Sequence, residues 1–228
     1  MNLVILAAGV GSRINMGIPK AMIRLVNGQT ILERQIEIAK QFISIEKIYV
    51  VAGYKQEMII DKFPQINVIS NPSYKSTNTA KSLLIALNNI DAETTIWING
   101  DVVFDSDALS SIADSQHSCM GVIECETGDE EIKFSTTSDG AIDRVSKEIQ
   151  FSSGEAIGIN KIIDQDLTLF LNALKRCKNQ DYFERGIELA INDGLKIFPT
   201  QITKGFAVEI DFEKDLDNAN KYLLSNDI

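Results

Sequence analysis

The sequence has no long apolar run, only three cysteines and fewer basic than acidic residues. No window approaches the ~18 consecutive apolar residues of a membrane-spanning helix, and no basic segment precedes the short apolar stretch near the N-terminus. The sequence therefore predicts no signal peptide and no membrane partner. The three cysteines form no CxxC pair, which is typical of free thiols in a cytoplasmic protein.

Basic residues number 22 against 32 acidic ones, which gives a net charge of −10. Proteins that bind nucleic acid by counterion release have the opposite balance, so we expect no nucleic-acid partner. Any anionic ligand must be held by a few placed cations and backbone amides. The 228 residues are 44% hydrophobic with a mean hydropathy of −0.01, which is typical of a globular protein with a sizeable core.

Strands and helices alternate over the first half of the chain. Short apolar runs predict strands at residues 3–7, 47–52, 67–70 and 95–98. Helical spacing predicts the intervening helices, at residues 31–42, 56–63 and 79–88. This alternation predicts an α/β fold, a Rossmann-like and mostly parallel sheet flanked by helices on both faces.

The pattern changes after about residue 115. Residues 120–125, 132–136 and 142–149 predict strands separated by turns, and hence a small antiparallel extension of a mixed sheet. We expect a later strand at 206–210 and helices at 167–175, 183–192 and 214–224. No linker or repeat marks a boundary, so the sequence favours a single domain over residues 1–228.

The connection after the first strand, LAAGVGSRINMGIPK (residues 6–20), is the most informative segment. Gly9 and Gly11 let the backbone approach a ligand closely, and successive amides can form an anion-binding concavity. Arg13 and Lys20 add two cations. The segment lacks the GK[ST] of a Walker A loop and the third glycine of GxGxxG. A bare GxG would indicate an ordinary turn, but the whole string is far more specific.

That string resembles the nucleotidyltransferase family, whose signature is an LAAG-x-G-x-R loop followed by PK. Members join a nucleoside triphosphate to a sugar phosphate or a small phospho-alcohol. The chain is most similar to the small cytidylyltransferases, such as the bacterial phosphocholine and inositol-phosphate enzymes. The stretch between Arg13 and Pro19 is short, so we expect a smaller lid over the triphosphate. The similarity extends along nearly the whole chain, at residues 53–54, 76–78, 99–101, 131–133, 146–147, 154–158 and 209–211.

The resemblance implies an in-line attack by an acceptor phosphate oxygen on the α-phosphorus of the nucleotide. Both reactants are anionic, so the barrier is largely electrostatic and calls for Mg²⁺ and placed cations. Arg13 and Lys20 are implied as the catalytic cations, with Lys20 on the α- or β-phosphate. A phosphate monoester is already nucleophilic at neutral pH, so the single histidine, His117, is expected to be exposed and non-catalytic.

Two aspartates are candidate metal ligands. Asp101 follows an apolar strand, at the edge of a parallel sheet where open α/β folds bind ligands. A carboxylate there suits Mg²⁺, which takes one or two carboxylates together with substrate phosphates. The resemblance implies Asp211 as the second ligand, although an aspartate there also suits an N-cap for the following helix.

The resemblance divides the remaining site residues between two halves, a nucleotide-binding half (1–115) and an acceptor-binding half (116–228). The nucleotide is expected to contact Leu6, Ala7, Ala8, Gly9, Gly11, Ser12, Gly53, Thr77, Asn78 and Ser82. Helix capping is an equally simple role for Asn78. The acceptor is expected to contact Lys133, Lys147, Glu155, Tyr182, Glu184 and Glu209. Carboxylates with an aromatic ring suit a cationic headgroup such as choline or an amine, while a polyol phosphate or a phosphorylated amino-acid-like acceptor stays open. Solvated strand positions for the two lysines, and surface positions for Glu155 and Glu184, are equally simple interpretations.

The sequence thus predicts a Mg²⁺-dependent nucleotidyltransferase that couples CTP to a small phosphorylated or phosphonylated alcohol, for capsule, surface-glycan or lipid-headgroup synthesis. A monomer or homodimer is expected. The alternative enzyme is a sugar-1-phosphate uridylyl- or guanylyltransferase. A non-catalytic nucleotide-binding regulatory module is an alternative of another class. A dinucleotide-dependent oxidoreductase ranks last, because Ala52-Gly53-Tyr54 lacks the acidic residue that closes the second strand of such folds.

Overall fold

A computed structural model describes residues 1–11, 17–125, 128, 131–203 and 205–226. The first four strands form a parallel sheet in the order β4-β1-β2-β3, in which Ile5 pairs with Val50 on one side and with Ile98 on the other. The predicted parallel α/β half is confirmed. These strands are β1 (Asn2–Ala7), β2 (Ile48–Ala52), β3 (Asn67–Ser70) and β4 (Thr95–Asn99).

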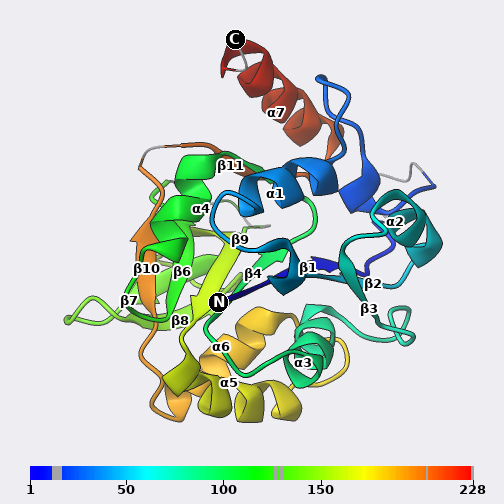
Figure 1. The fold of residues 1–228 in the computed structure, drawn as a ribbon. Coiled ribbons are helices and arrows are strands. Elements are labelled where there is room, and N and C mark those ends of the chain that lie inside the picture. The colour runs from blue at the N-terminus through cyan, green and yellow to red at the C-terminus, as the bar shows by residue number, and fades with distance from the viewer. Residues whose placement is uncertain (12–16, 126–127, 129–130, 204, 227–228) are drawn as a thin grey trace.

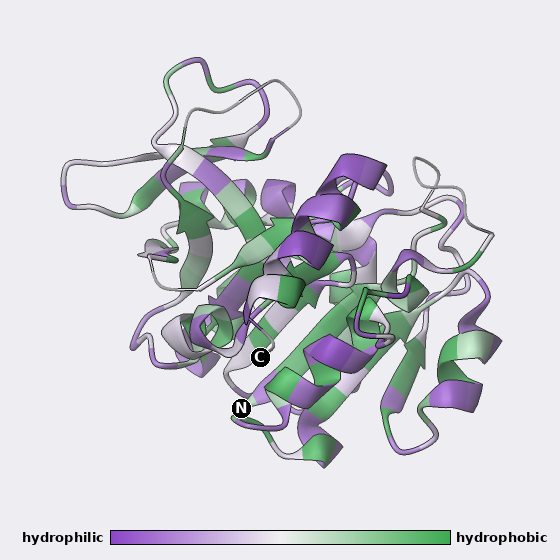
Figure 2. Cartoon of the chain, turned by 90° about the horizontal axis from the view of Figure 1, so that it is seen from above, coloured by the Kyte–Doolittle hydropathy of each residue, from purple (hydrophilic) through white to green (hydrophobic). Residues whose placement is uncertain are grey.

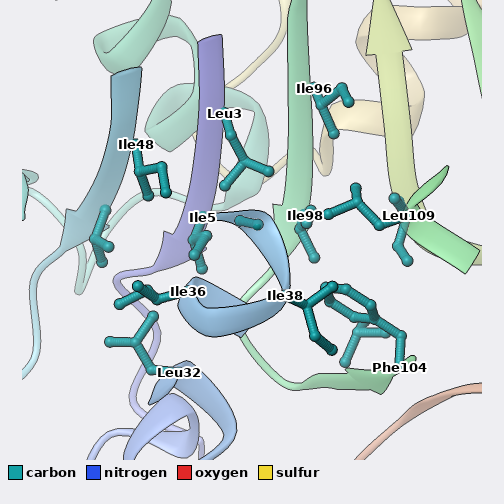
Figure 3. Close-up of a cluster of buried hydrophobic side chains, with 14 of the residues drawn as sticks. Leu3, Ile5, Leu32, Ile36, Ile38, Ile48, Ile96, Ile98, Phe104 and Leu109 are labelled. Atoms are coloured by element: carbon teal, nitrogen blue, oxygen red, sulfur yellow. The ribbon is translucent and has the colours of Figure 1, made fainter. Parts of the chain in front are cut away.

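Alternate residues of β1 belong to two separate cores, one on each face of the sheet. Leu3 and Ile5 pack with Leu32 and Ile36 of α1 on one face, as Figure 3 shows. Val4 and Leu6 face the opposite core, beneath α3, α5 and α6. Both faces of a parallel strand are therefore covered, which explains its continuous apolar run. The helices are α1 (Ile31–Ala39), α2 (Gln56–Lys62), α3 (Thr79–Asn89), α4 (Ser106–Ala113), α5 (Asp164–Arg176), α6 (Phe183–Asn192) and α7 (Glu213–Asn226).

Helix α1 begins with a capping box. The Thr30 hydroxyl accepts a hydrogen bond from the Glu33 backbone amide at 3.2 Å, and the Glu33 carboxylate accepts one from the Thr30 amide at 2.6 Å. These two contacts satisfy amides that have no partner inside the helix. The cap fixes where the chain turns back to cover the sheet.

The second half of the chain extends the same sheet. Strand β9 (Gly154–Ile162) lies antiparallel between β4 and β6, and the full order is β10-β6-β9-β4-β1-β2-β3. The hairpin of β7 and β8 attaches to β9, so the predicted antiparallel extension is confirmed. The remaining strands are β5 (Val102–Phe104), β6 (Cys119–Ile123), β7 (Lys133–Thr136), β8 (Ile142–Ser146), β10 (Phe198–Gln201) and β11 (Ala207–Glu209).

The sequence prediction missed β5, β9, β10 and α4. Strand β9 escaped because glycines interrupt its apolar pattern, and these glycines have a structural reason. Gly158 has φ +69°, and a Cβ there would lie 2.9 Å from Nδ2 of the Asn99 side chain. Strand β10 also pairs parallel with β6, so the extension is not wholly antiparallel.

Strands β5 and β11 form a separate two-stranded sheet against which α7 packs. Figure 1 shows α7 beside α1, at the opposite side of the main sheet from α3, α5 and α6. Figure 2 shows apolar strands in the interior and hydrophilic residues on the helices around them. In the described part of the chain no helix is both long and apolar enough to cross a bilayer. Cys119 and Cys177 are buried and Cys125 is exposed, all three as free thiols.

Candidate active site

A cavity of about 730 Å³ opens at the carboxyl ends of β1 and β4. Its lining includes Leu6 and Ala7 from the end of β1, Asn99 from the end of β4, and Gly100 and Asp101 from the turn that follows. The volume lies within the usual range for small-molecule sites. Its position at the carboxyl edge of parallel strands is where open α/β folds bind ligands.

Lys20 lies between two aspartates in this cavity. Its Nζ atom is 2.9 Å from Asp101 Oδ2 and 2.6 Å from Asp211 Oδ1. Burial alone would lower the pKa of Lys20, but the two carboxylates outweigh burial and raise the pKa above its ordinary value. The ammonium therefore stays charged and offsets the repulsion between the aspartates.

Backbone contacts bring these three residues together from distant parts of the chain. The Gly100 amide donates to the Leu6 carbonyl at 2.9 Å, which fixes the turn after β4 against the end of β1. A Cβ at Gly100 would lie 2.8 Å from that same carbonyl oxygen, so the close approach requires glycine. The Ile210 amide donates to the Asp101 carbonyl at 3.0 Å, which places Asp211 beside Asp101.

The second glycine of the loop after β1, Gly11, occupies a position where a side chain would not fit. Its φ is +65°, and a Cβ there would lie 2.8 Å from Lys20 Cγ. The loop therefore passes over the lysine stem at a distance that a side chain would prevent.

Further carboxylates adjoin the aspartates. Glu209 accepts a hydrogen bond from the Asn99 side chain at 3.3 Å. Burial, followed by the charges of Asp101 and Asp211, raises the pKa of Glu209 well above its usual range. Asp215 Oδ2 accepts from the backbone amides of Asp211 and Phe212, at 3.1 and 2.7 Å. Asp215 thus satisfies amides at the start of α7, while Asp211 Oδ1 faces Lys20.

The donor set at this edge suits a hard divalent cation. Asp101 and Asp211 present carboxylate oxygens to one point, where Lys20 Nζ now lies. Within the described residues no cluster of three or more His, Cys, Asp or Glu side chains forms a metal cage. Two carboxylates without a full cage fit Mg²⁺, because this ion takes most of its remaining ligands from phosphates and water.

Residues 3–147 match the family model described as the MobA-like NTP transferase domain. The chain belongs to this family. The predicted nucleotidyltransferase family, and the enzyme class that goes with it, are confirmed.

Among curated relatives, the bifunctional protein GlmU of Methanococcus vannielii is 40% identical over 115 residues, covering 48% of this chain and 26% of the relative. The GlmU of Neisseria meningitidis serogroup A is 26% identical over 214 residues, covering 89% and 46%. The chain thus spans less than half the length of these relatives.

Solved structures show that this NTP transferase domain shares its fold with several others. The inositol-1-phosphate CTP transferase from T. maritima aligns with a TM-score of 0.81 and 18% identity, over 98% of this chain and 94% of the other. The CTP:phosphocholine cytidylyltransferase LicC from Streptococcus pneumoniae aligns with a TM-score of 0.77 and 18% identity, over 97% and 98%. A UDP-glucose pyrophosphorylase aligns with a TM-score of 0.79 and 14% identity, over 98% of each chain. The predicted fold class is confirmed.

The structure brings most of the predicted site residues to the cavity. Those that line it are Leu6, Ala7, Gly9, Gly11, Lys20, Thr77, Asn78, Asp101, Lys147, Glu155, Tyr182, Glu184, Glu209 and Asp211. Ser12 and Arg13 lie outside the described residues, so their roles stay predictions.

Three residues predicted to contact the nucleotide, Ala8, Gly53 and Ser82, do not line the cavity and have structural contacts in the surrounding fold. The Ala8 carbonyl accepts from the Tyr54 amide at 3.1 Å. A Cβ at Gly53 would lie 2.6 Å from Tyr74 Cβ and 2.9 Å from the Ala8 carbonyl, so this glycine lets Tyr74 approach. Ser82 is buried and accepts from the Asn71 side chain at 3.0 Å.

Asn78 has a second role besides lining the cavity, and Lys133 lies outside the cavity. Asn78 lines the cavity, and its side chain also accepts from the Thr79 amide at the start of α3, which bears out the capping role. Lys133 is buried on β7 opposite Glu155 of β9, so the two side chains share a face of the sheet, but Lys133 does not line the cavity. His117 is exposed and contacts Phe198.

Several lining residues were not assigned a role from the sequence, although Asn99 and Glu131 lie in segments that carry the resemblance. These residues are Tyr74, Thr79, Asn99, Glu131, Phe212, Lys214 and Asp215. Tyr74 and Asn99 follow or end strands of the parallel sheet, so the carboxyl-edge rule applied to every strand would have found them. Glu131 lies in a segment that carries the family resemblance (131–133), but no role was assigned to it, because its approach to the cavity depends on the pairing of β7 with β9.

Proposed function

We propose that the chain catalyses transfer of a nucleotidyl group from a nucleoside triphosphate to a small phosphorylated acceptor. An acceptor phosphate oxygen attacks the α-phosphorus, the bond from the α-phosphorus to the bridging oxygen breaks, and pyrophosphate leaves. The observation that carries the proposal is Lys20 held between Asp101 and Asp211 at the edge of the cavity. This combination supplies a cation for the phosphates and carboxylates for a metal ion at one point.

Lys20 is the residue we assign to transition-state stabilisation. Its ammonium would bind the α- or β-phosphate and neutralise charge that grows as pyrophosphate leaves. Asp101 and Asp211 would hold Mg²⁺, which when bound neutralises phosphate charge. Arg13 is proposed on the β- and γ-phosphates from the sequence pattern alone.

CTP is the proposed nucleotide, and the first half of the chain (1–115) is proposed to bind it. Thr77 and Asn78 offer small hydrogen-bonding groups at the cavity, which suit a pyrimidine edge and ribose. The fold neighbours that act on CTP support this choice, whereas the UDP-glucose pyrophosphorylase keeps the uridylyl alternative as a second outcome of the test. The second half (116–228) is proposed to bind the acceptor, within one domain.

Synthesis of a capsule, surface-glycan or lipid headgroup is the process we propose, since such pathways use alcohols activated by a nucleotidyl group.

Pyrophosphate release with Mg²⁺ tests the proposal. The assay combines each of CTP, UTP, GTP and ATP with phosphorylated alcohols and with sugar 1-phosphates. Release with CTP and a non-sugar acceptor supports the full proposal. Release only with another nucleotide and a sugar 1-phosphate supports the alternative, and no release with any pair contradicts transfer.

Asp101→Asn is expected to lower kcat by at least about 100-fold at saturating nucleotide, since the metal ion loses a charged ligand. Raising the Mg²⁺ concentration should recover part of the loss, which a purely structural role would not allow. Asp217→Asn on the exposed face of α7 is the matched control and should behave as wild type. Unchanged kcat and Mg²⁺ dependence in Asp101→Asn would remove the metal assignment.

A further inference from the structure

Glu184 is a buried carboxylate in the cavity that the transfer chemistry does not use. It lies in the first turn of α6 and is 8% exposed. Its Oε2 atom has no hydrogen-bond partner within the described part of the chain. Burial raises the pKa of Glu184 to about 7, although its own backbone amide and the Lys147 charge act in the opposite direction. A buried polar atom without a partner is costly, so this position fits a group supplied by a ligand.

Glu184 shares the cavity with three further glutamates, Glu131, Glu155 and Glu209. The Oε2 atom of Glu131 is likewise buried without a hydrogen-bond partner in the described residues. Burial, followed by the Glu131 charge, raises the pKa of Glu155. Lys147 lines the same cavity, so this region holds carboxylates in excess of lysines, which disfavours the phosphate group of the acceptor at Glu184. A positive charge on the acceptor would relieve the repulsion among the carboxylates.

The unpartnered oxygens also indicate what kind of cation fits. A carboxylate oxygen accepts hydrogen bonds, and a primary ammonium group carries three N–H donors. A quaternary ammonium has no donor and is typically bound by several aromatic rings. The aromatic side chains among the described lining residues are Tyr74, Tyr182 and Phe212. Tyr74 packs over Gly53, while Tyr182 and Phe212 are 52% and 41% exposed, so the three rings do not form a buried aromatic cage.

We propose that the acceptor is a phosphomonoester or phosphonate whose carbon chain carries a primary ammonium group, and that Glu184 binds this group. The proposal rests on the proposed function and names its substrate class. The ammonium is not consumed, because it forms hydrogen bonds with Glu184 while a phosphate oxygen at the other end of the acceptor attacks the α-phosphorus.

Three probes of similar size test this assignment by calorimetric titration, with Mg²⁺ and a non-hydrolysable CTP analogue present. O-phosphoethanolamine carries the primary ammonium, n-propyl phosphate replaces it by a methyl group, and phosphocholine replaces its protons by methyl groups. We expect O-phosphoethanolamine to bind at least tenfold more tightly than either of the others. In Glu184→Gln the preference over n-propyl phosphate should fall to within twofold. Glu188→Gln, one turn along the same helix with its carboxylate 3.0 Å from Arg185, should keep the full preference.

Equal binding of O-phosphoethanolamine and n-propyl phosphate, tightest binding of phosphocholine, or no binding of any probe would each overturn the proposal. A preference that survives Glu184→Gln, with the fold verified by circular dichroism, would overturn the assignment to Glu184. The proposed function is judged separately. Nucleotide binding together with turnover of a neutral acceptor would leave the transfer reaction standing and reject only the ammonium. No binding of any nucleoside triphosphate would reject the transfer reaction itself.

Discussion

At the residue scale, charge pairing decides what the cavity can bind. Lys20 is the cation that contacts both Asp101 and Asp211, at 2.9 and 2.6 Å. In contrast, Glu184 is a carboxylate whose Oε2 lacks a partner in the described residues. Lys20 therefore offsets one of the two aspartate charges at its side of the cavity, whereas the Glu184 oxygen is left for a ligand to pair with.

Replacing Lys20 by alanine should lower kcat by about 100-fold or more, as expected when a group that stabilises transition-state charge is removed. The two aspartates would also repel each other more strongly, so the free energy of unfolding should fall. Steady-state pyrophosphate release and urea denaturation measure the two effects. Lys40→Ala, at the exposed end of α1, is the control. Wild-type kinetics in Lys20→Ala would contradict its catalytic role.

Glu184 should make stability depend on pH. Its pKa is about 7 in the folded chain against an ordinary value of 4.5, because it is buried. The folded state therefore holds the proton more tightly than the unfolded state, and stability falls as pH rises from about 4.5 to 7. Glu184→Gln should be more stable than wild type at pH 8 by roughly 2–3 kcal/mol, and equally stable near pH 4.5. Urea denaturation at both pH values measures this. A constant difference between the two proteins would show that burial of the charge is not the cause.

At the element scale, caps and close approaches place the secondary structure. The capping box of Thr30 and Glu33 begins α1, whose Leu32 and Ile36 pack on Leu3 and Ile5 of β1. The interrupted pattern of β9 shows the opposite case, since Gly158 is favoured by its positive φ and by its close contact with the Asn99 side chain. Local sequence predicts the first kind of element well and the second poorly.

Thr30→Ala should destabilise the protein by about 1 kcal/mol, because the Glu33 amide loses its acceptor. Thr30→Ser keeps the hydroxyl and should stay within a few tenths of a kcal/mol of wild type. Chemical denaturation of the three proteins checks this. Equal losses in the two variants would mean that the buried methyl group, not the cap, is responsible.

At the scale of the whole molecule, the site exists only because both halves of the chain fold together. Lys20 and Asp101 come from the first half and Asp211 from the second, and the Ile210–Asp101 backbone hydrogen bond joins them. The carboxylates of α6, β9 and β11 line the same cavity. Ligand binding should therefore stabilise the entire fold rather than one half.

CTP together with Mg²⁺ should raise the melting temperature cooperatively. At one hundred times the Kd the gain is about 2.7 kcal/mol, which corresponds to roughly 5–10 °C for a domain of this size. CTP without Mg²⁺ should give a smaller shift, and Asp101→Asn should reduce the difference that Mg²⁺ makes at a given Mg²⁺ concentration. A scan with two separate transitions, of which CTP moves only one, would contradict a single coupled fold.

The sequence by itself determined the parallel half of the fold, the loop after β1 and the family. These features rest on local signals, namely apolar runs, helical spacing, glycines and a contiguous motif that ends in Pro19-Lys20. The carboxyl-edge rule and the resemblance also predicted Lys20, Asp101 and Asp211 as residues of one site, and the structure places these three side chains in contact.

Only the tertiary structure decided the position of β9, the parallel pairing of β10 and the charge state of the cavity. Strand β9 depends on partners far away in sequence, so its glycines obscure the local pattern. Ser82 supports Asn71 and Lys133 lies beside the cavity rather than in it, which no spacing rule could distinguish. Burial and unpaired oxygens, as at Glu184, arise when several segments pack around one carboxylate, and they are properties of the folded molecule alone.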